Sequence, residues 1–234
     1  PPAGAFWREG LRGFDAPTPP AVARPDEPGA GVEEAYHYLS GDATASLLAL
    51  ARGRGLTLNT LVQGAWALLL ARYAGEDDVV FGATVSGRPA EVAGVEQMVG
   101  LFINTLPVRA RLRPAARVGD WLAELQQQQA EARRFEHAPL MKVQGWSEVP
   151  AGEPLFESLL IFENYPVDDA LRAPSDESVY ISGARSLEHT TYPLALIVLP
   201  GSSLGLRLAY DSARFDGGAV RRLLDHLAGV VPAF

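Results

Sequence analysis

Histidine is the side chain that most often serves as a general base near neutral pH, and the sequence contains four: His37, His137, His189 and His226. None has a second histidine at the spacing of a helical metal site, and none has an aspartate four residues further on. The sequence has no cysteine, which excludes thiolate catalysis, disulfides and cysteine-based zinc sites. We therefore predict no catalytic residue and no metal site in this chain, and we interpret His137 as a helix cap or a surface side chain.

Charge and hydropathy exclude further classes of function. The net charge is −8 and the arginines are scattered, whereas a nucleic-acid partner requires a basic stripe. The most apolar run, Leu58 to Tyr73, is too short to span a bilayer and contains Asn59 and Gln63. The N-terminus lacks the pattern of a signal peptide. We expect a cytoplasmic protein with no nucleic-acid partner, no membrane partner and no directly bound cofactor.

The first stretch that could bind a substrate ends an apolar run. Residues Phe81 to Val85 are followed by Ser86, Gly87 and Arg88, a hydroxyl, a glycine and a guanidinium. Binding sites in α/β proteins are usually built at strand ends, so these three residues are candidates for a site. The alternative interpretation is an ordinary turn with an exposed arginine.

A second candidate interrupts the apolar run from Val99 to Arg109 with Asn104 and Thr105. A buried asparagine must satisfy its amide with hydrogen bonds, either to backbone or to a ligand. The local sequence leaves both alternatives open.

Aromatic side chains form the third candidate. This candidate consists of two segments, Phe135 to Leu140 and Gly152 to Pro166. The second segment includes Phe162 and Tyr165. Aromatic residues at such positions belong to a core more often than they stack on a ligand.

These candidates require helices and strands to position them. The periodicity of apolar residues predicts helices over 42–53, 57–73, 118–135 and 217–231, and strands over 35–39, 78–85, 102–112, 157–162, 180–181, 194–199 and 204–210. The four glutamines Gln126 to Gln129 suggest a solvated helix face. This mixture of helices and strands predicts an α/β fold with a mixed sheet. Residues 1–34, rich in proline and glycine, are predicted to be a linker with a helical turn at Phe6 to Leu11, and residues 35–234 the globular part.

Taken in order, these stretches resemble the C-terminal half of condensation domains from nonribosomal peptide synthetases. The resemblance rests on Leu56 to Trp66, Gly75 to Arg88, the Gly-x-Phe-(Val/Ile)-Asn-Thr match at Gly100 to Thr105, Glu136 to Leu140, and Phe156 to Pro166. It covers the chain from about Phe6 to Gly229.

The resemblance implies a fold and an activity. Members of this family have two lobes, each similar to chloramphenicol acetyltransferase, a two-layer sandwich of mixed sheet and packed helices. Amide bonds form in a tunnel between the lobes, from thioesters that two peptidyl carrier proteins deliver on phosphopantetheine arms. The family's His-His-x-x-x-Asp-Gly motif lies in the N-terminal lobe and is absent here. The chain is therefore expected to be a single C-terminal lobe, inert alone, in an assembly that makes an antibiotic or siderophore.

The resemblance also assigns roles to the candidates. It places Ser86, Gly87, Arg88, Asn104, Thr105, Phe162 and Tyr165 at the tunnel, and it favours Asn104 as a substrate contact over a structural one. Part of Val167 to Glu188 is expected to include the family's crossover latch toward the N-terminal lobe or to lie near it. The implied partners are the N-terminal lobe, donor and acceptor carrier proteins and an adjacent adenylation domain, and the implied subtype joins two L-configured residues.

Three alternatives remain. A complete acyltransferase of the chloramphenicol acetyltransferase kind would need a His-x-x-x-Asp arrangement, which the sequence lacks. A non-catalytic module that docks carrier proteins, or a lobe of the related epimerisation or heterocyclisation type, would share this fold. The coding sequence upstream of Pro1 distinguishes the main interpretation from a docking module, because a catalytic domain requires the histidine motif there.

Overall fold

The computed structural model describes residues 2–88, 92–163 and 190–234. They form one six-stranded sheet in the order β1-β6-β5-β4-β2-β3. The strands are β1 (Val32–Tyr38), β2 (Asp78–Val85), β3 (Asn104–Arg111), β4 (Ser158–Phe162), β5 (Leu194–Leu199) and β6 (Gly205–Asp211). β4 pairs in parallel with β2 and with β5, and the other neighbours are antiparallel. The mixed sheet expected from the sequence is thus confirmed.

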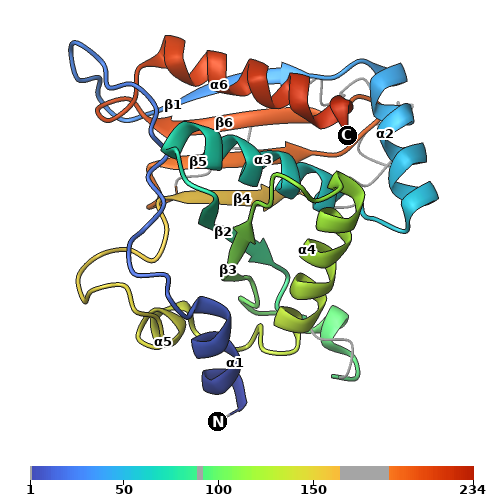
Figure 1. The fold of residues 1–234 in the computed structure, drawn as a ribbon, viewed down its shortest axis with the longest axis vertical. Coiled ribbons are helices and arrows are strands. Elements are labelled where there is room, and N and C mark those ends of the chain that lie inside the picture. The colour runs from blue at the N-terminus through green and yellow to red at the C-terminus, as the bar shows by residue number, and fades with distance from the viewer. Residues whose placement is uncertain (1, 89–91, 164–189) are drawn as a thin grey trace, which may run out of the picture.

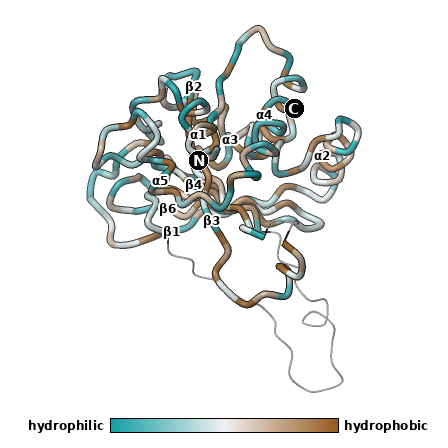
Figure 2. Tube along the Cα trace, turned by 90° about the horizontal axis from the view of Figure 1, so that it is seen from below, coloured by the Kyte–Doolittle hydropathy of each residue, from teal (hydrophilic) through white to brown (hydrophobic). Residues whose placement is uncertain are grey.

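Helices cover one face of this sheet, as Figure 1 shows. They are α2 (Gly41–Arg54), α3 (Leu58–Ala74), α4 (Val118–Arg133) and α6 (Gly217–Val230). Three of them begin at a side-chain cap, because Ser40, Thr57 and Asp216 each accept a hydrogen bond from a backbone N–H in the first turn. Seen along the sheet, α2, α3 and α4 lie on one side, while an apolar loop projects from the start of β3 on the other (Figure 2). The arrangement is the expected two-layer sandwich.

α3 is buried on nearly all sides, as its continuous apolar sequence predicts. α4 approaches it closely at Gly64, where an added Cβ would lie 2.2 Å from a methyl carbon of Leu122. Gln126 joins the two helices: its Oε1 accepts hydrogen bonds from Thr57 N at 2.9 Å and Thr60 Oγ1 at 2.8 Å. The expectation of a solvated glutamine face is therefore wrong for Gln126, since its amide caps the neighbouring helix.

The proline-rich N-terminal segment packs along the sheet. Its helix α1 (Pro2–Leu11) and the following turn bury Trp7, Leu11 and Phe14 in a second apolar cluster that includes Phe156 of the chain before β4. Further along, Asp216 N donates to Ala23 O at 2.8 Å, and Gly29 N donates to Ser212 O at 3.0 Å. Residues 2–31 therefore have many fixed contacts with the globular part.

Arg109 of β3 fixes the end of α1. Its guanidinium is only 5% exposed and donates to Gly10 O at 3.1 Å and Arg12 O at 2.8 Å. It also binds both carboxylate oxygens of Asp78, at 2.8 and 2.7 Å. Such a paired fork satisfies the buried charge and the helix carbonyls together.

Element boundaries differ from the prediction in a few places. β3 begins at Asn104 instead of Phe102, because the preceding residues turn away from β2. α1 is ten residues long instead of a single turn. The short helix α5 (Leu140–Gln144), which contacts α1, was not predicted. The predicted strand Tyr180–Ile181 lies outside the described residues.

Replacing Asp78 tests the Arg109 fork. Burial raises the pKa of the Asp78 carboxyl, but hydrogen bonds and charge from Arg109 and Arg111 lower that pKa by more, so the net pKa is below its ordinary value. We expect Asp78→Asn to lower the free energy of unfolding at pH 7 by about 2 kcal/mol, less than for a fully buried pair because Asp78 is 39% exposed.

The pH dependence follows from the lowered pKa. The carboxylate contributes fully above the unfolded-state pKa of about 3.9 and loses its contribution as the pH falls through the folded-state value. Urea unfolding of parent and variant should therefore converge as the pH is lowered below about 4. A constant difference from pH 7 to acid would contradict the ion-pair account.

Candidate functional site

The ends of β2 and β3 bring most of the predicted site residues together. The two strands pair antiparallel, with Val85 opposite Asn104 and Thr84 opposite Thr105. Ser86 to Arg88 leave the end of β2 at the point where Asn104 begins β3. The sequence placed these residues at strand ends, and the pairing makes them neighbours.

Arg88 is turned onto the loop that connects the two strands. Its guanidinium donates to Val95 O and to Met98 O, the latter at 3.0 Å, and lies 4.3 Å from the centre of the Phe102 ring. Gly87 has φ +65°, and a Cβ there would lie 1.7 Å from the Phe102 carbonyl oxygen. Arg88 therefore binds the loop at residues 92–103, and Gly87 lies closely against it.

Asn104 holds a different loop. Its side-chain NH₂ donates to Glu136 O at 2.6 Å and Ala138 O at 3.0 Å, and its Oδ1 accepts from Thr105 N at 2.9 Å. Both amide hydrogens are engaged by backbone just after α4. The hypothesis that the Asn104 amide is available to substrate is not supported by these bonds, and the structural alternative accounts for them.

The other two candidates lie elsewhere. Phe162, at the end of β4, is half-buried and packs against the core between the sheet and the helices. Tyr165 and the expected latch at Val167 to Glu188 lie outside the described residues.

The sequence did not lead us to predict a buried charged cluster on the face of the sheet opposite the helices. Arg207 of β6 is 5% exposed and pairs with Glu34 of β1 at 3.5 Å and Glu163 after β4 at 3.2 Å. The signal lies in the alternation of Leu206, Arg207 and Leu208, which places the arginine on the face away from the helices.

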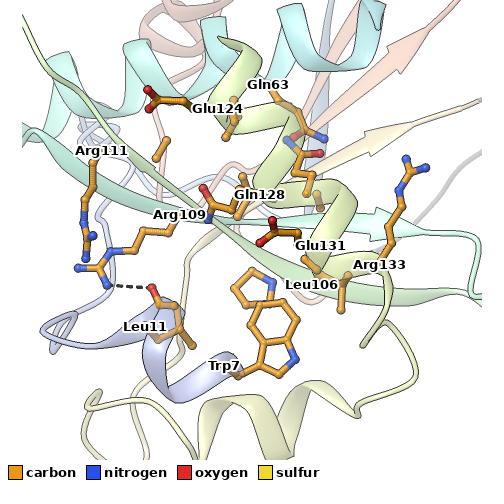
Figure 3. Close-up of a pocket in the computed structure, with 18 of the residues that line it drawn as sticks. Trp7, Leu11, Gln63, Leu106, Arg109, Arg111, Glu124, Gln128, Glu131 and Arg133 are labelled. Carbon is orange, nitrogen blue, oxygen red and sulfur yellow. Dashed lines mark hydrogen bonds between the residues drawn. The ribbon is translucent and has the colours of Figure 1, made fainter. Parts of the chain in front are cut away.

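A cavity of about 720 Å³ runs along the outer edge of β3 between α1 and α4 (Figure 3). Trp7 lies at one end of the view and Gln63 at the other, with Arg109, Gln128 and Glu131 between them. None of the six predicted site residues that are described lines it. The glutamine run contributes Gln128 and Gln129, a role that its sequence did not indicate.

The strand edge in this cavity is poorly suited to pairing with another strand. Leu112 N donates to Asp77 O, and the register of β2 with β3 then turns the backbone of residues 105, 107, 109 and 111 outward. Thr105 N–H is bound by Asn104, Pro107 has no N–H, and Arg111 O accepts from Trp121 Nε1 at 3.0 Å. These features interrupt the ladder that a new strand would need.

Of the described histidines, His137 lies in the loop whose carbonyls Asn104 binds, whereas His37 lies beside α6 and His226 within it. His37 Nδ1 is 3.3 Å from Asp225 Oδ1, His226 Nδ1 is 2.9 Å from Tyr73 Oη, and His137 is exposed after α4. The segment Gly201–Gly205 matches a G-x-S-x-G pattern, but it turns between antiparallel β5 and β6, whereas a nucleophile elbow joins a strand to a helix. No group of three metal-binding side chains occurs in the described parts of the chain.

Comparison with known proteins gives a consistent result. The family model described as "Condensation domain" matches residues 3–234. One protein of the linear gramicidin synthase of Brevibacillus parabrevis is 48% identical over 97% of this chain, which corresponds to 3% of that protein. Surfactin synthase subunit 3 of Bacillus subtilis (strain 168) is 35% identical over 95% of this chain and 17% of its own length. The chain thus spans a small part of these relatives.

Solved structures share the fold. The X-domain from teicoplanin biosynthesis has a TM-score of 0.77 and 24% identity over 99% of this chain and 54% of its own. The first condensation domain of the CDA synthetase has a TM-score of 0.73 and 15% identity over 99% of this chain and 50% of its own. No helix in residues 2–88, 92–163 and 190–234 is long and apolar enough to cross a membrane.

Substitutions at Asn104 test its role as a loop anchor. Asn104→Ala removes the donors to two carbonyls in a buried turn and should lower the free energy of unfolding by about 2–3 kcal/mol. Asn104→Asp keeps the shape but replaces the donors with acceptors, so its loss should be larger. Thr105→Ala is the matched control, with an expected loss below about 1 kcal/mol. Chemical unfolding measures all three, and parental stability in Asn104→Ala would exclude the anchoring role.

Proposed function

The chain belongs to the condensation domain family, and we propose that it is the C-terminal lobe of such a domain, the part that forms one wall of the tunnel where amide bonds are made. In this proposal the acceptor amine attacks the carbonyl carbon of the donor thioester. The new C–N bond forms, the C–S bond breaks, and the donor's thiol leaves. The base or orienting histidine comes from the other lobe.

The extent of the chain supports the single-lobe proposal. It covers 54% of the teicoplanin X-domain structure and 50% of the CDA condensation domain while being matched over 99% of its own length in both cases. Its sequence contains no pair of adjacent histidines. Positioned general acid–base catalysis contributes about 10²–10⁴-fold, so a lobe without that group should be inactive alone.

The observation that carries the proposal is the surface of the loop at residues 92–103. Leu101 is 92% exposed, Val99 is fully exposed, and Ile103 is 53% exposed. Figure 2 shows this apolar loop projecting from the face of the sheet opposite the helices. Neighbouring exposed apolar side chains of this kind mark an interaction surface. We propose that the N-terminal lobe covers them.

The finer assignments follow from the same proposal. The substrates are aminoacyl or peptidyl groups on the phosphopantetheine arms of donor and acceptor carrier proteins, and the subtype is the one that joins L-configured residues. An adenylation domain is the expected neighbour. Ser86 to Arg88, Asn104 and Phe162 then act at the tunnel through the loops and core that they hold, and Tyr165 remains a proposed tunnel residue.

We expect no amide product when this chain alone is mixed with loaded donor and acceptor carrier proteins. Adding the segment encoded upstream, with its histidine motif, should restore product, detected by mass spectrometry of the acceptor carrier. The control is the upstream segment with both histidines changed to alanine. Product from this chain alone above the uncatalysed background would contradict the proposal, and no product from the reunited domain would favour a docking module.

The isolated chain should self-associate and bind an apolar dye through the loop surface. Leu101→Glu places a charge on that surface at a highly exposed side chain and should reduce both effects without altering the fold. Leu50→Glu on α2, which is partly buried against the core, serves as a contrast that should instead lower stability. Sedimentation at several concentrations measures association. A parental chain that stays monomeric and binds no dye would argue against a covered apolar surface.

A further inference from the structure

We propose that Arg88 is a positioning residue that shapes the loop at residues 92–103 into the surface that contacts the other lobe. This inference rests on the proposed function, because it assigns a purpose to the loop. It does not place Arg88 on a substrate, since the interactions described for its guanidinium are with the loop itself.

The guanidinium donates hydrogen bonds to the loop at two positions. Its Nη1 donates to Val95 O and its Nη2 to Met98 O at 3.0 Å, while Met98 N donates to Val95 O at 3.2 Å. Arg88 thus ties both ends of the short turn at Val95–Gln97 to the end of β2. A planar fork can bind two carbonyls in fixed directions, which a lysine ammonium does less well.

The same side chain sets the direction of the residues that follow. Its guanidinium carbon lies 4.3 Å from the centre of the Phe102 ring, well within the range of a cation–π interaction. Phe102 is half-buried beneath it, whereas the flanking Leu101 and Ile103 are exposed. Holding one aromatic ring inward therefore turns its two apolar neighbours outward.

Gly87 completes this arrangement. Its backbone lies so close to Phe102 that a Cβ would be 1.7 Å from the Phe102 carbonyl oxygen, and its φ of +65° favours glycine. The chain entering the loop and the chain leaving it therefore touch beside Arg88. The loop has a closed base fixed by two consecutive residues and an apolar tip that they do not cover.

The test compares Arg88→Lys and Arg88→Met with the parent, and uses Arg52→Lys on the exposed side of α2 as the matched control. The first measurement is amide hydrogen exchange of residues 95–103 in this chain alone. We expect exchange to accelerate by at least about tenfold in both Arg88 variants, an opening free energy lower by about 1.4 kcal/mol. Exchange in β5 should stay unchanged because the core is unaffected.

The second measurement is binding of each variant to the separately produced upstream lobe. We expect the dissociation constant to rise by at least about tenfold for Arg88→Lys as well as Arg88→Met, because the planar fork and not the charge alone is required. Arg52→Lys should leave it unchanged.

The two measurements distinguish a failure of this inference from a failure of the proposed function. If exchange in the loop is unchanged in both variants, Arg88 does not hold the loop and the inference is wrong. If the loop loosens while the dissociation constant stays at the parental value, Arg88 has a local structural role only, and the inference is again wrong. If the parent chain itself does not bind the upstream lobe, the proposed function fails first, and the positioning role fails with it.

Discussion

The antiparallel pairing of β2 with β3 is the constraint on which this end of the molecule depends. The register sets Val85 opposite Asn104, so the residues just beyond one strand lie beside the first residue of the other. From that point Arg88 reaches the carbonyls of one loop and Asn104 reaches the carbonyls of another. Carbonyls in loops have no strand partner, and a buried one left without a donor costs about 1–3 kcal/mol. Two polar side chains at one strand junction therefore fix two irregular segments.

The same register explains why the edge of β3 beside the cavity is poorly suited to pairing with a further strand. Asn104 satisfies the first outward N–H and Trp121 the last outward carbonyl, while Pro107 has no N–H between them. An edge without a continuous row of donors does not invite a further strand. The edge of β3 that lines the cavity between α1 and α4 is thus a poor template for strand addition.

The sequence predicted the elements well because their signals are local. Apolar periodicity located α3 and α6, and the continuous apolar runs located β2 and β5. The roles of polar residues were harder, because their partners are distant. Asn104 binds carbonyls 32 and 34 residues away, and Gln126 binds Thr57, 69 residues away. Sequence alone showed that the Asn104 amide needed partners, but only the fold shows that backbone supplies them.

The attachment of α1 has a consequence for how the chain transmits motion. Trp7, Leu11 and Phe14 are buried in an apolar cluster beside the sheet, and Arg109 binds the carbonyls at the end of the helix. The proline-rich stretch behind it is also tied down, at Ala23 and Gly29. A hinge needs a segment with few contacts, whereas this stretch is held by hydrogen bonds at Ala23 and Gly29. Because α1 is held both at its apolar face and at its C-terminal carbonyls, it moves with the sheet as one body.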